Sequence, residues 1–429
     1  MDSKIFPPAD AQTDRADEEL GGPSRRKAHP AYQSFQFPDF RWLVLGTFFS
    51  FLAVSMQQIT RGWLILRLTD DSPFALSLVM MSFALPLTFA SVLGGALADR
   101  PARKHIIMVS QGGNALLTLL LAILDMTDLV RFWHLMCIGF MNGTLAAFNM
   151  PSRQSLISDI VPAKNLMNAI SLSSAGMNLT RIVGPAVAGI LIIYLDTAGV
   201  FCLIALIYVF SALSTAMIRA GQKPLDRSEK GVAADIRAGF QYALWDSTLL
   251  GLLIMAFVPA LFGFPYLALI PAWAREALDA QSDGLGLLMT SMGTGSLVGT
   301  LILASIRQLN RRGAVLVINS LAWGICLILF SQSASYITAL PSLFLVGLMS
   351  GIFMSLNMTL MQLYSTAEMR GRIVSMAMMT FGIMPLSAVP FGAIAENMGT
   401  ANSLGLSGLF LCFFTVAFFF SYPKLRKVA

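Results

Sequence analysis

Long apolar stretches, each about the length needed to cross a lipid bilayer as an α-helix, follow one another along most of the chain. None shows the period-two alternation that marks a strand of a membrane barrel. A helical run of about 20 apolar residues matches a hydrocarbon layer about 30 Å thick. Twelve transmembrane helices are predicted, at Trp42–Leu66, Phe74–Ala98, His105–Leu124, Phe132–Met150, Leu166–Leu195, Thr197–Ile218, Leu249–Trp273, Gly284–Ile306, Ala314–Phe330, Thr338–Leu363, Ile373–Glu396 and Ser403–Tyr422.

One segment occurs twice, once in the fourth predicted helix and once in the tenth. Residues 139–154 read GFMNGTLAAFNMPSRQ and residues 347–362 read GLMSGIFMSLNMTLMQ. The glycines in each copy have the small-xxx-small spacing that lets two membrane helices approach closely. A repeat in matching helices predicts an all-α membrane protein with twelve transmembrane helices in two pseudo-symmetric six-helix bundles.

The composition supports a membrane location. Hydrophobic residues make up 56% of the chain and charged residues only 12%, whereas a soluble domain carries about 25% charged residues. Lys and Arg gather in the first 41 residues and in alternate loops, which predicts that both termini are cytoplasmic. The net charge of +6 then follows from topology, and no nucleic-acid partner is expected.

These patterns divide the chain into five parts. Residues 1–40 are predicted to be a flexible cytoplasmic tail, 41–219 the first bundle, 220–247 a cytoplasmic linker, 248–423 the second bundle and 424–429 a short cytoplasmic tail. Apolar residues recur every four positions in the linker, which favours an amphipathic helix on the membrane surface. No cleaved signal peptide is expected. The four cysteines fall within predicted helices and are interpreted as packing residues.

The loop after the second predicted helix carries an ordered series of glycine, acid and base. Residues 94–108 read GGALADRPARKHIIM. This stretch resembles the Gly-x-Leu-Ala-Asp-Arg-x-Gly-Arg-Lys signature of the major facilitator superfamily, with alanine in place of the second glycine. The resemblance implies the major facilitator fold and an inner-side conformational latch, which consists of Gly95, Asp99, Arg100, Arg103 and Lys104. The alternative is a positive loop with an incidental aspartate.

A second resemblance narrows the family. Residues 151–192 and 370–382 are similar to the bacterial exporter branch that includes enterobactin exporters and macrolide efflux proteins. Gly184, Pro185 and Gly189 resemble the fifth-span signature associated with antiporters of the superfamily, and a helix kink is expected there. Many drug antiporters of the superfamily carry an arginine in the fourth span where this chain has glycine, so a proton route through that arginine is not expected here.

Arg181 lies near the middle of the fifth predicted helix. A cation there costs about 2.5–3.5 kcal/mol on insertion scales unless it faces water or a partner, so it is expected to face a central cavity. Pro185 leaves the carbonyl of Arg181 without its helical hydrogen bond, which predicts local unwinding. No acid falls in the middle third of a predicted helix.

Two hypotheses follow from this charge pattern. In one, an anionic substrate pairs with Arg181. In the other, protons are handled by Asp99 or by the outer pair Asp125 and Asp128. A purely structural guanidinium is the alternative to both.

Other polar or aromatic residues are candidates for lining the cavity or forming an inner gate. The cavity candidates besides Arg181 are Gln57, Gln58, Arg61, Asn142, Asn178, Phe257, Phe262 and Asn357. The inner-gate candidates are Asn149, Gln154, Asn357, Gln362, Arg370 and Arg372. Adjacent residues of a helix point in different directions, so at most one of the two neighbouring glutamines is expected to line the cavity. Headgroup contacts, helix capping and plain packing are the structural alternatives.

No combination of residues indicates catalysis, a cofactor or a metal site, and the three histidines lie far apart in the sequence. The patterns and the resemblance together favour a secondary transporter of the bacterial inner membrane that works by alternating access as a monomer. We expect it to export a small amphiphilic compound, drug-like or siderophore-like, with protons as the candidate coupling ion. The alternatives are a facilitator or importer of a small metabolite and a non-transporting membrane sensor or scaffold.

Overall fold

All regular secondary structure among the described residues is helical. The computed structural model describes residues 30–98, 103–219, 246–306, 311–366 and 369–422. The elements are η1 Pro30–Gln36, α2 Pro38–Leu68, α3 Pro73–Ala98, α4 Arg103–Met126, α5 Phe132–Ile160, α6 Ala163–Ala216, α8 Ser247–Phe262, α9 Tyr266–Leu278, α10 Ser282–Ser305, α11 Arg312–Ser331, α12 Tyr336–Tyr364, α13 Arg370–Met398 and α14 Thr400–Ser421. The predicted all-α class is confirmed.

Eight helical segments in the described residues are long and apolar enough to cross a membrane, one of them made of α8 and α9 together. Their limits are Pro38–Leu68, Arg103–Met126, Lys164–Ala216, Thr248–Leu278, Ser282–Ser305, Arg312–Ser331, Tyr336–Tyr364 and Thr400–Ser421. A continuous apolar stretch can satisfy its backbone in lipid only as a helix, which explains why the hydrophobic pattern predicts these elements well.

Two of these segments change direction at positions that the sequence marks. Helix α6 has 54 residues and turns at Asp196, whose φ of 54° departs from the helical value. Its ψ of 177° also lies outside the helical range, and this combination is one that glycine adopts more easily than other residues. The predicted limit between the fifth and sixth spans falls at the same residue. Helices α8 and α9 make up one predicted span, divided before Pro265, a residue that cannot donate a backbone hydrogen bond.

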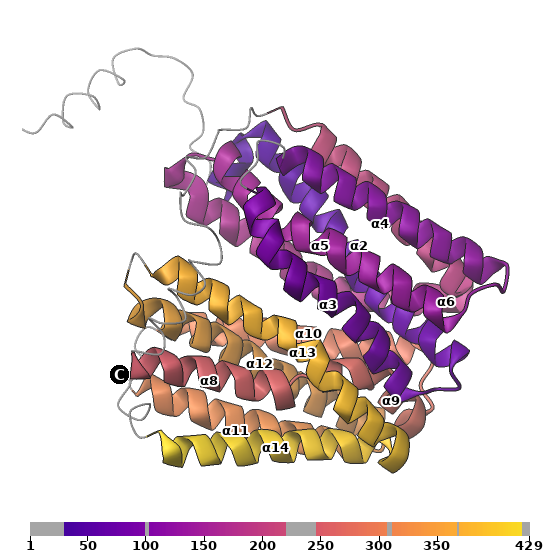
Figure 1. Ribbon diagram of the computed structural model, residues 1–429, viewed down its shortest axis with the longest axis vertical. Coiled ribbons are helices and arrows are strands. Elements are labelled where there is room, and N and C mark those ends of the chain that lie inside the picture. The colour runs from indigo at the N-terminus through magenta and orange to yellow at the C-terminus, as the bar shows by residue number, and fades with distance from the viewer. Residues whose placement is uncertain (1–29, 99–102, 220–245, 307–310, 367–368, 423–429) are drawn as a thin grey trace, which may run out of the picture.

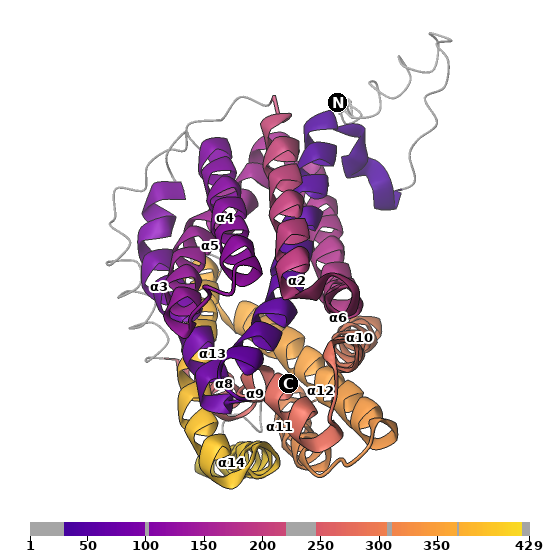
Figure 2. The ribbon, with the colours of Figure 1, turned by 90° about the vertical axis from the view of Figure 1, so that its right-hand side faces the viewer.

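The helices form two groups that lie side by side (Figures 1 and 2). Helices α2 to α6 pack mainly on one another, as do helices α8 to α14. We name the ends of these groups by residues. The Asp71 end carries the turn between α2 and α3, and the Pro38 end carries the start of α2. The two groups approach each other near the Asp71 end and diverge toward the Pro38 end, as the inclined ribbons in Figure 1 show.

The repeated segment takes equivalent positions in the two groups. In α5, Gly139 and Gly143 lie against α3, where a Cβ added to Gly143 would overlap the carbonyl oxygen of Phe83. In α12, Gly347 and Gly351 lie against α10, where a Cβ added to either would overlap a backbone carbonyl oxygen. Each glycine pair therefore permits one close helix contact, as the small-xxx-small spacing predicts.

The last part of the predicted amino-terminal tail, from residue 30 to residue 40, is helical and packs against the first group as η1 and the start of α2. Ser34 donates from its Oγ to the carbonyl of Asn165 at 3.2 Å. Phe35 and Phe37 pack against a small core at the Pro38 end that includes Phe40. These aromatic residues supply the apolar surface that the preceding residues lack. Residues 1–29, most of the linker and the carboxyl-terminal tail lie outside the described residues.

The cysteines only partly behave as packing residues. Cys326 is buried, whereas Cys137 is exposed on α5. A thiol is apolar enough to face acyl chains, so its presence in an apolar run does not distinguish a core position from a lipid-facing one.

Candidate functional site

Polar contacts connect the two groups at the Asp71 end. Arg275 Nε lies 3.3 Å from Asp71 Oδ1, and the guanidinium carbon of Arg275 lies 4.9 Å from the centre of the Trp63 ring. Glu396 Oε2 accepts a hydrogen bond from Ser72 Oγ at 2.9 Å. Exposed pairs of this kind contribute at most about 1 kcal/mol each. They close this end with bonds weak enough to break in a conformational change.

The glycine–proline signature lies where α6 contacts α10. Ser282 Oγ donates to the carbonyl of Gly189 at 2.9 Å. A Cβ added to Gly189 would lie 2.5 Å from the carbonyl oxygen of Ser282 and 3.1 Å from Gly286 Cα. On another side of α6, Gly184 lies against Ser55 of α2. The signature thus provides smooth surfaces for close packing between helices and between groups.

The local unwinding predicted at Arg181 is wrong, whereas the kink predicted at Gly184, Pro185 and Gly189 stays a prediction. Within α6, Asp196 is the residue whose φ and ψ leave the helical range. The carbonyl of Arg181 lies against α10, where a Cβ added to Gly293 would approach it to 3.2 Å. The next carbonyl, that of Ile182, accepts a hydrogen bond from Thr290 Oγ1 at 3.1 Å. The backbone around Pro185 therefore keeps helical dihedral angles, and its carbonyls lie in a helix contact.

The side chain of Arg181 faces the side of α6 that the second group covers further along the helix. Pro185 and Gly189, four and eight residues later, contact α10, and a repeat of 3.6 residues per turn places all three on one side. Val183 and Ile190 are exposed on the opposite side, where lipid is expected. Arg181 is itself exposed and has no hydrogen-bond or ion-pair partner among the described residues. The structure thus supports the expected orientation toward the second group.

Two of the predicted cavity residues lie inside the first group and bind each other. Arg61 Nη2 donates to Asn142 Oδ1 at 2.7 Å, and Asn142 Nδ2 donates to Asn114 Oδ1 at 2.7 Å. The Nε of Arg61 is buried without a partner among the described residues. Arg61 therefore points inward to α4 and α5, and the alternative of headgroup contact does not hold.

Gln57 occupies the same interior seam one turn away. Its Nε2 donates to Thr118 Oγ1 at 3.0 Å, and its Oε1 accepts from Tyr208 OH at 3.1 Å. Gln58 is exposed, so the two neighbouring glutamines do differ as predicted. Sequence reasoning missed Asn114 and Thr118, although polar residues four apart within an apolar helix indicate one buried polar face.

Of the remaining cavity candidates, Asn178 is half-buried on the same helix as Arg181, and Phe257 is 37% exposed. Phe262 packs in the second group, since its ring stacks on Phe414 at 4.7 Å between centroids with an interplanar angle of 2°. The prediction that Phe262 lines a cavity is therefore not supported, and its packing alternative holds. The sequence alone cannot distinguish aromatic residues that pack against one another from aromatic residues that line a substrate cavity.

The amides of the repeat behave alike in both copies. Asn149 and Asn357 are buried, at 8% and 5% exposure, whereas Gln154 and Gln362 are exposed. Asn149 Oδ1 accepts from Arg153 Nε at 3.4 Å. The asparagines thus lie within their groups, whereas the exposed glutamines stay candidates for an inner gate. Two further gate candidates, Arg370 and Arg372, begin α13, and their side chains lie outside the described part of the structure.

The predicted latch is only partly described, since Asp99 and Arg100 lie outside the described residues and Gly95 is near the end of α3. Arg103 Nη1 lies 2.6 Å from Asp159 Oδ2, with both side chains at least 95% buried. Lys104 Nζ donates to the carbonyls at the end of α6, including that of Ala216 at 2.8 Å. These two cations anchor the start of α4 within the first group.

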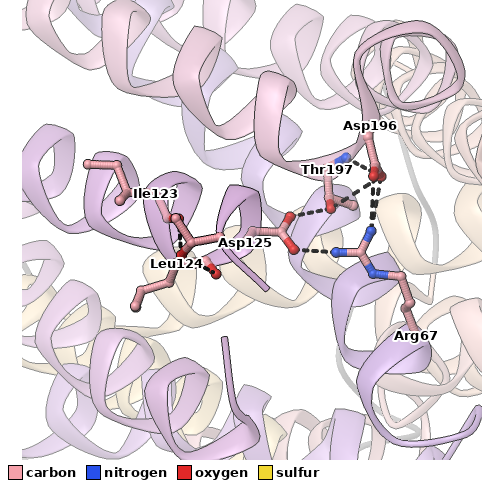
Figure 3. A network of polar contacts seen from close by, with 7 residues as sticks. Arg67, Ile123, Leu124, Asp125, Asp196 and Thr197 are labelled. Carbon is pink, nitrogen blue, oxygen red and sulfur yellow. Dashed lines mark hydrogen bonds and ion pairs between the residues drawn. The ribbon is translucent and has the colours of Figure 1, made fainter. Parts of the chain in front are cut away.

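A charged cluster joins three helix ends of the first group at the Asp71 end (Figure 3). Arg67 forms ion pairs with Asp125 and with Asp196, the latter at 3.1 Å. Asp125 also accepts a hydrogen bond from Thr197 Oγ1. The Asp125 side chain is fully buried, whereas that of Asp196 is 68% exposed. Asp125 therefore pairs with Arg67, while proton handling by Asp125 and Asp128 stays a hypothesis.

Asp125→Asn is expected to lower the free energy of unfolding by about 1–3 kcal/mol, because a buried acceptor shared by a guanidinium and a hydroxyl is weakened. Asp196→Asn is the matched control. It is expected to cost less than about 0.5 kcal/mol, since that carboxylate is exposed and the side-chain oxygen of asparagine can still accept from the backbone N–H of Thr197. Thermal unfolding of the purified variants measures both changes. Equal losses in the two variants would contradict the unequal roles of the two acids.

Comparison with known families decides what these helices form. The sequence model of a family described as transmembrane secretion effector matches residues 30–428. The chain belongs to this family. It is a membrane transporter of the major facilitator superfamily and not an enzyme.

Several known transporters are similar to the chain over nearly its whole length. The staphyloferrin A transporter of Staphylococcus aureus is 23% identical over 393 residues, which cover 90% of this chain and 97% of that protein. The enterobactin exporter EntS of Shigella flexneri is 25% identical and covers 91% and 93%. The multidrug efflux pump Tap of Mycolicibacterium fortuitum is 27% identical and covers 85% and 91%.

Solved structures agree on the fold of this transporter. A bacterial homologue of the human lysosomal transporter Spinster, in an inward-facing and occupied conformation, superposes with a TM-score of 0.74 at 14% identity over 92% of this chain and 97% of that chain. The nucleoside transporter NupG also reaches 0.74, at 12% identity over 90% and 99%. At such identities the likeness concerns the fold alone.

Proposed function

We propose that the protein is an exporter with twelve transmembrane helices, in two six-helix bundles, that works by alternating access in the bacterial inner membrane. In this proposal α6 supplies two of the twelve spans, and α8 with α9 supplies one. The Pro38 end faces the cytoplasm, because the loops at that end carry most of the Lys and Arg residues. Each chain holds both groups of helices, so a monomer is sufficient for transport.

The single observation that carries this proposal is the position of Arg181 along one face of α6. Near the Asp71 end this face is covered by α10, through Pro185 and Gly189. Toward the Pro38 end the same face is exposed, and it presents Arg181 and then the half-buried Asn178. With the orientation proposed above, the closed end is the outer one, and the polar face is open to the cytoplasm. An exporter loads its substrate in this conformation.

The cargo is proposed from the relatives and from the exposed residues. Relatives named as a staphyloferrin A transporter, an enterobactin exporter and a multidrug efflux pump favour a small amphiphilic compound that moves outward. Arg181, Asn178 and Gln58 offer polar contacts on helices that are otherwise apolar, which suits a molecule with both polar and apolar parts. Proton coupling has no acid in the middle of a described helix to support it.

A thermal-shift screen of amphiphilic compounds on the purified protein tests this function. A ligand that binds the folded state at 100 times its Kd stabilises it by about 2.7 kcal/mol. We expect the stabilisation to disappear in Arg181→Ala and to persist in Arg312→Ala, which removes an equal charge from the start of α11. The bound compound should then leave loaded liposomes only when the protein is present. Binding without any transport would favour a sensor instead.

A further inference from the structure

The charges inside the helices have one sign. Each Asp or Glu in the described helices lies in a first or last turn, or at the turn of α6, as Asp125, Asp159 and Glu396 illustrate. Arg181 lies far from the ends of α6, and Arg61 and Arg153 each lie about two turns from the end of their helix. None of these three arginines has an ion-pair partner among the described residues.

From this imbalance we propose that the substrate is an anionic amphiphile, whose carboxylate or comparable pair of oxygen atoms binds Arg181, and that it leaves the cell with its negative charge. The inference rests on the proposed transport function and narrows its substrate class. The relatives do not decide the charge of the substrate, because one is named as a multidrug efflux pump and others are named for staphyloferrin A and enterobactin. An anionic substrate would decide it for this protein.

The three arginines differ in whether their guanidinium groups are available to bind a ligand. Arg61 donates to Asn142, and Arg153 Nη1 donates to Thr47 Oγ1 at 2.7 Å. Both guanidinium groups are therefore fixed by neutral side chains inside the first group, each with one further nitrogen, Arg61 Nε or Arg153 Nη2, buried without a partner among the described residues. They still add positive potential in a medium of low dielectric constant, where charges act over long distances. Arg181 alone is exposed and unpartnered among the described residues, so it is the group available to a ligand.

The chemistry of Arg181 selects for a planar anion. A guanidinium can donate two parallel hydrogen bonds to a carboxylate, which a lone ammonium cannot match in geometry. The helix face that carries it continues with Ser174 and Asn178, neutral groups that can donate or accept hydrogen bonds without competing for charge. A cationic amphiphile would meet only repulsion here, because the described helices hold no acid near this face.

Outward movement of an anion also explains how export can proceed without a buried acid. The inside of a bacterial cell is electrically negative, and about 100 mV supplies about 2.3 kcal/mol for each negative charge that moves out. This corresponds to an approximately 50-fold concentration gradient per charge. The membrane potential then drives export directly through the charge of the substrate, and each cycle moves net negative charge outward.

Proteoliposomes test the proposal with three probes that share one fluorophore: dansylglycine, which is an anion, dansylglycinamide, which is neutral, and dansylcadaverine, which is a cation. The probes are loaded inside, and a potassium gradient with valinomycin makes the interior negative at equal pH on both sides. We expect protein-dependent efflux of dansylglycine, at least about 10-fold faster than without the potential. Efflux should fall at least about 10-fold in Arg181→Ala and remain unchanged in Arg312→Ala.

The outcomes distinguish a failure of the anion assignment from a failure of the proposed transport function. Protein-dependent efflux of the cationic probe, unchanged in Arg181→Ala, would overturn the anion assignment while leaving transport intact. Efflux of no probe by the wild-type protein would count against the proposed function itself. Size-exclusion profiles and unfolding temperatures without ligand show whether Arg181→Ala is folded. Arg181→Lys, which keeps the charge but loses the paired donors, should retain potential-driven efflux at a reduced rate.

Discussion

Gly143→Ala should strongly destabilise the first group of helices, because its new methyl group meets the backbone of a neighbouring helix. The added Cβ would overlap the carbonyl oxygen and carbon of Phe83, which belong to α3 and cannot rotate away. Overpacking of this kind costs about 1–3 kcal/mol, and here α3 and α5 must separate to relieve it. We expect an apparent unfolding temperature lower by about 5 °C in detergent, with reduced yield of folded protein.

Gly112→Ala is the matched control for this substitution. It adds the same methyl group to a helix of the same group, at a position with no heavy atom within 4 Å of the new Cβ. Its unfolding temperature should equal that of the wild type or exceed it slightly, because alanine favours the helix. If Gly143→Ala and Gly112→Ala unfold at the same temperature, the close contact between α3 and α5 does not exist in the protein.

Gly189→Ala should change the conformational equilibrium while leaving both groups folded. Its Cβ would lie 2.5 Å from the carbonyl oxygen of Ser282, at the contact between α6 and α10. The penalty falls on the state in which the Asp71 end is closed and disappears when the groups separate there. A cost of about 1.4 kcal/mol shifts the equilibrium tenfold toward the opposite state.

The labelling rate of a cysteine at Thr290 by a thiol reagent in the external medium measures this shift. Thr290 lies in the same contact, where its Oγ1 donates to the carbonyl of Ile182 at 3.1 Å. In a background without the four native cysteines, labelling should be about 10-fold faster with Gly189→Ala. Gly176→Ala, on the same helix with no atom within 4 Å of its Cβ, should leave the rate unchanged. Equal rates in both variants would show that Gly189 does not control this end.

Much of the architecture follows from patterns that depend on local chemistry. An apolar run predicts a helix in lipid whatever its neighbours are, and the turn at Asp196 lies where the run is interrupted. Gly143 and Gly351 predict close contacts, because only glycine permits them, and the structure places both against a neighbouring helix. The family signature near Gly95 and the match over residues 30–428 agree with each other.

The site was less predictable, because the partners of a polar side chain depend on tertiary packing. Arg61 and Asn142 are 81 positions apart and bind each other inside the first group, which no local pattern indicates. Asn149 and Asn357 are buried, although the predicted spans place them near the cytoplasmic ends. The unwinding at Arg181 was predicted only from the missing N–H of Pro185. In the structure the carbonyl of Arg181 lies against α10, and the backbone there keeps helical dihedral angles. Its exposure toward the second group follows from the cost of a lipid-facing charge.

Two rigid groups should rock against each other during transport, which opens the contact between α6 and α10 at the Asp71 end, and distances between spin labels measure this motion. One pair of labels, at Gln154 and Gln362, reports the Pro38 end, and another, at Thr127 and Asn397, reports the Asp71 end. All four positions are exposed, and each pair has one member in each group. Gly189→Ala, or a transported ligand, should shorten the first distance and lengthen the second. If both distances stay constant, or both change in the same direction, alternating access by this motion is wrong.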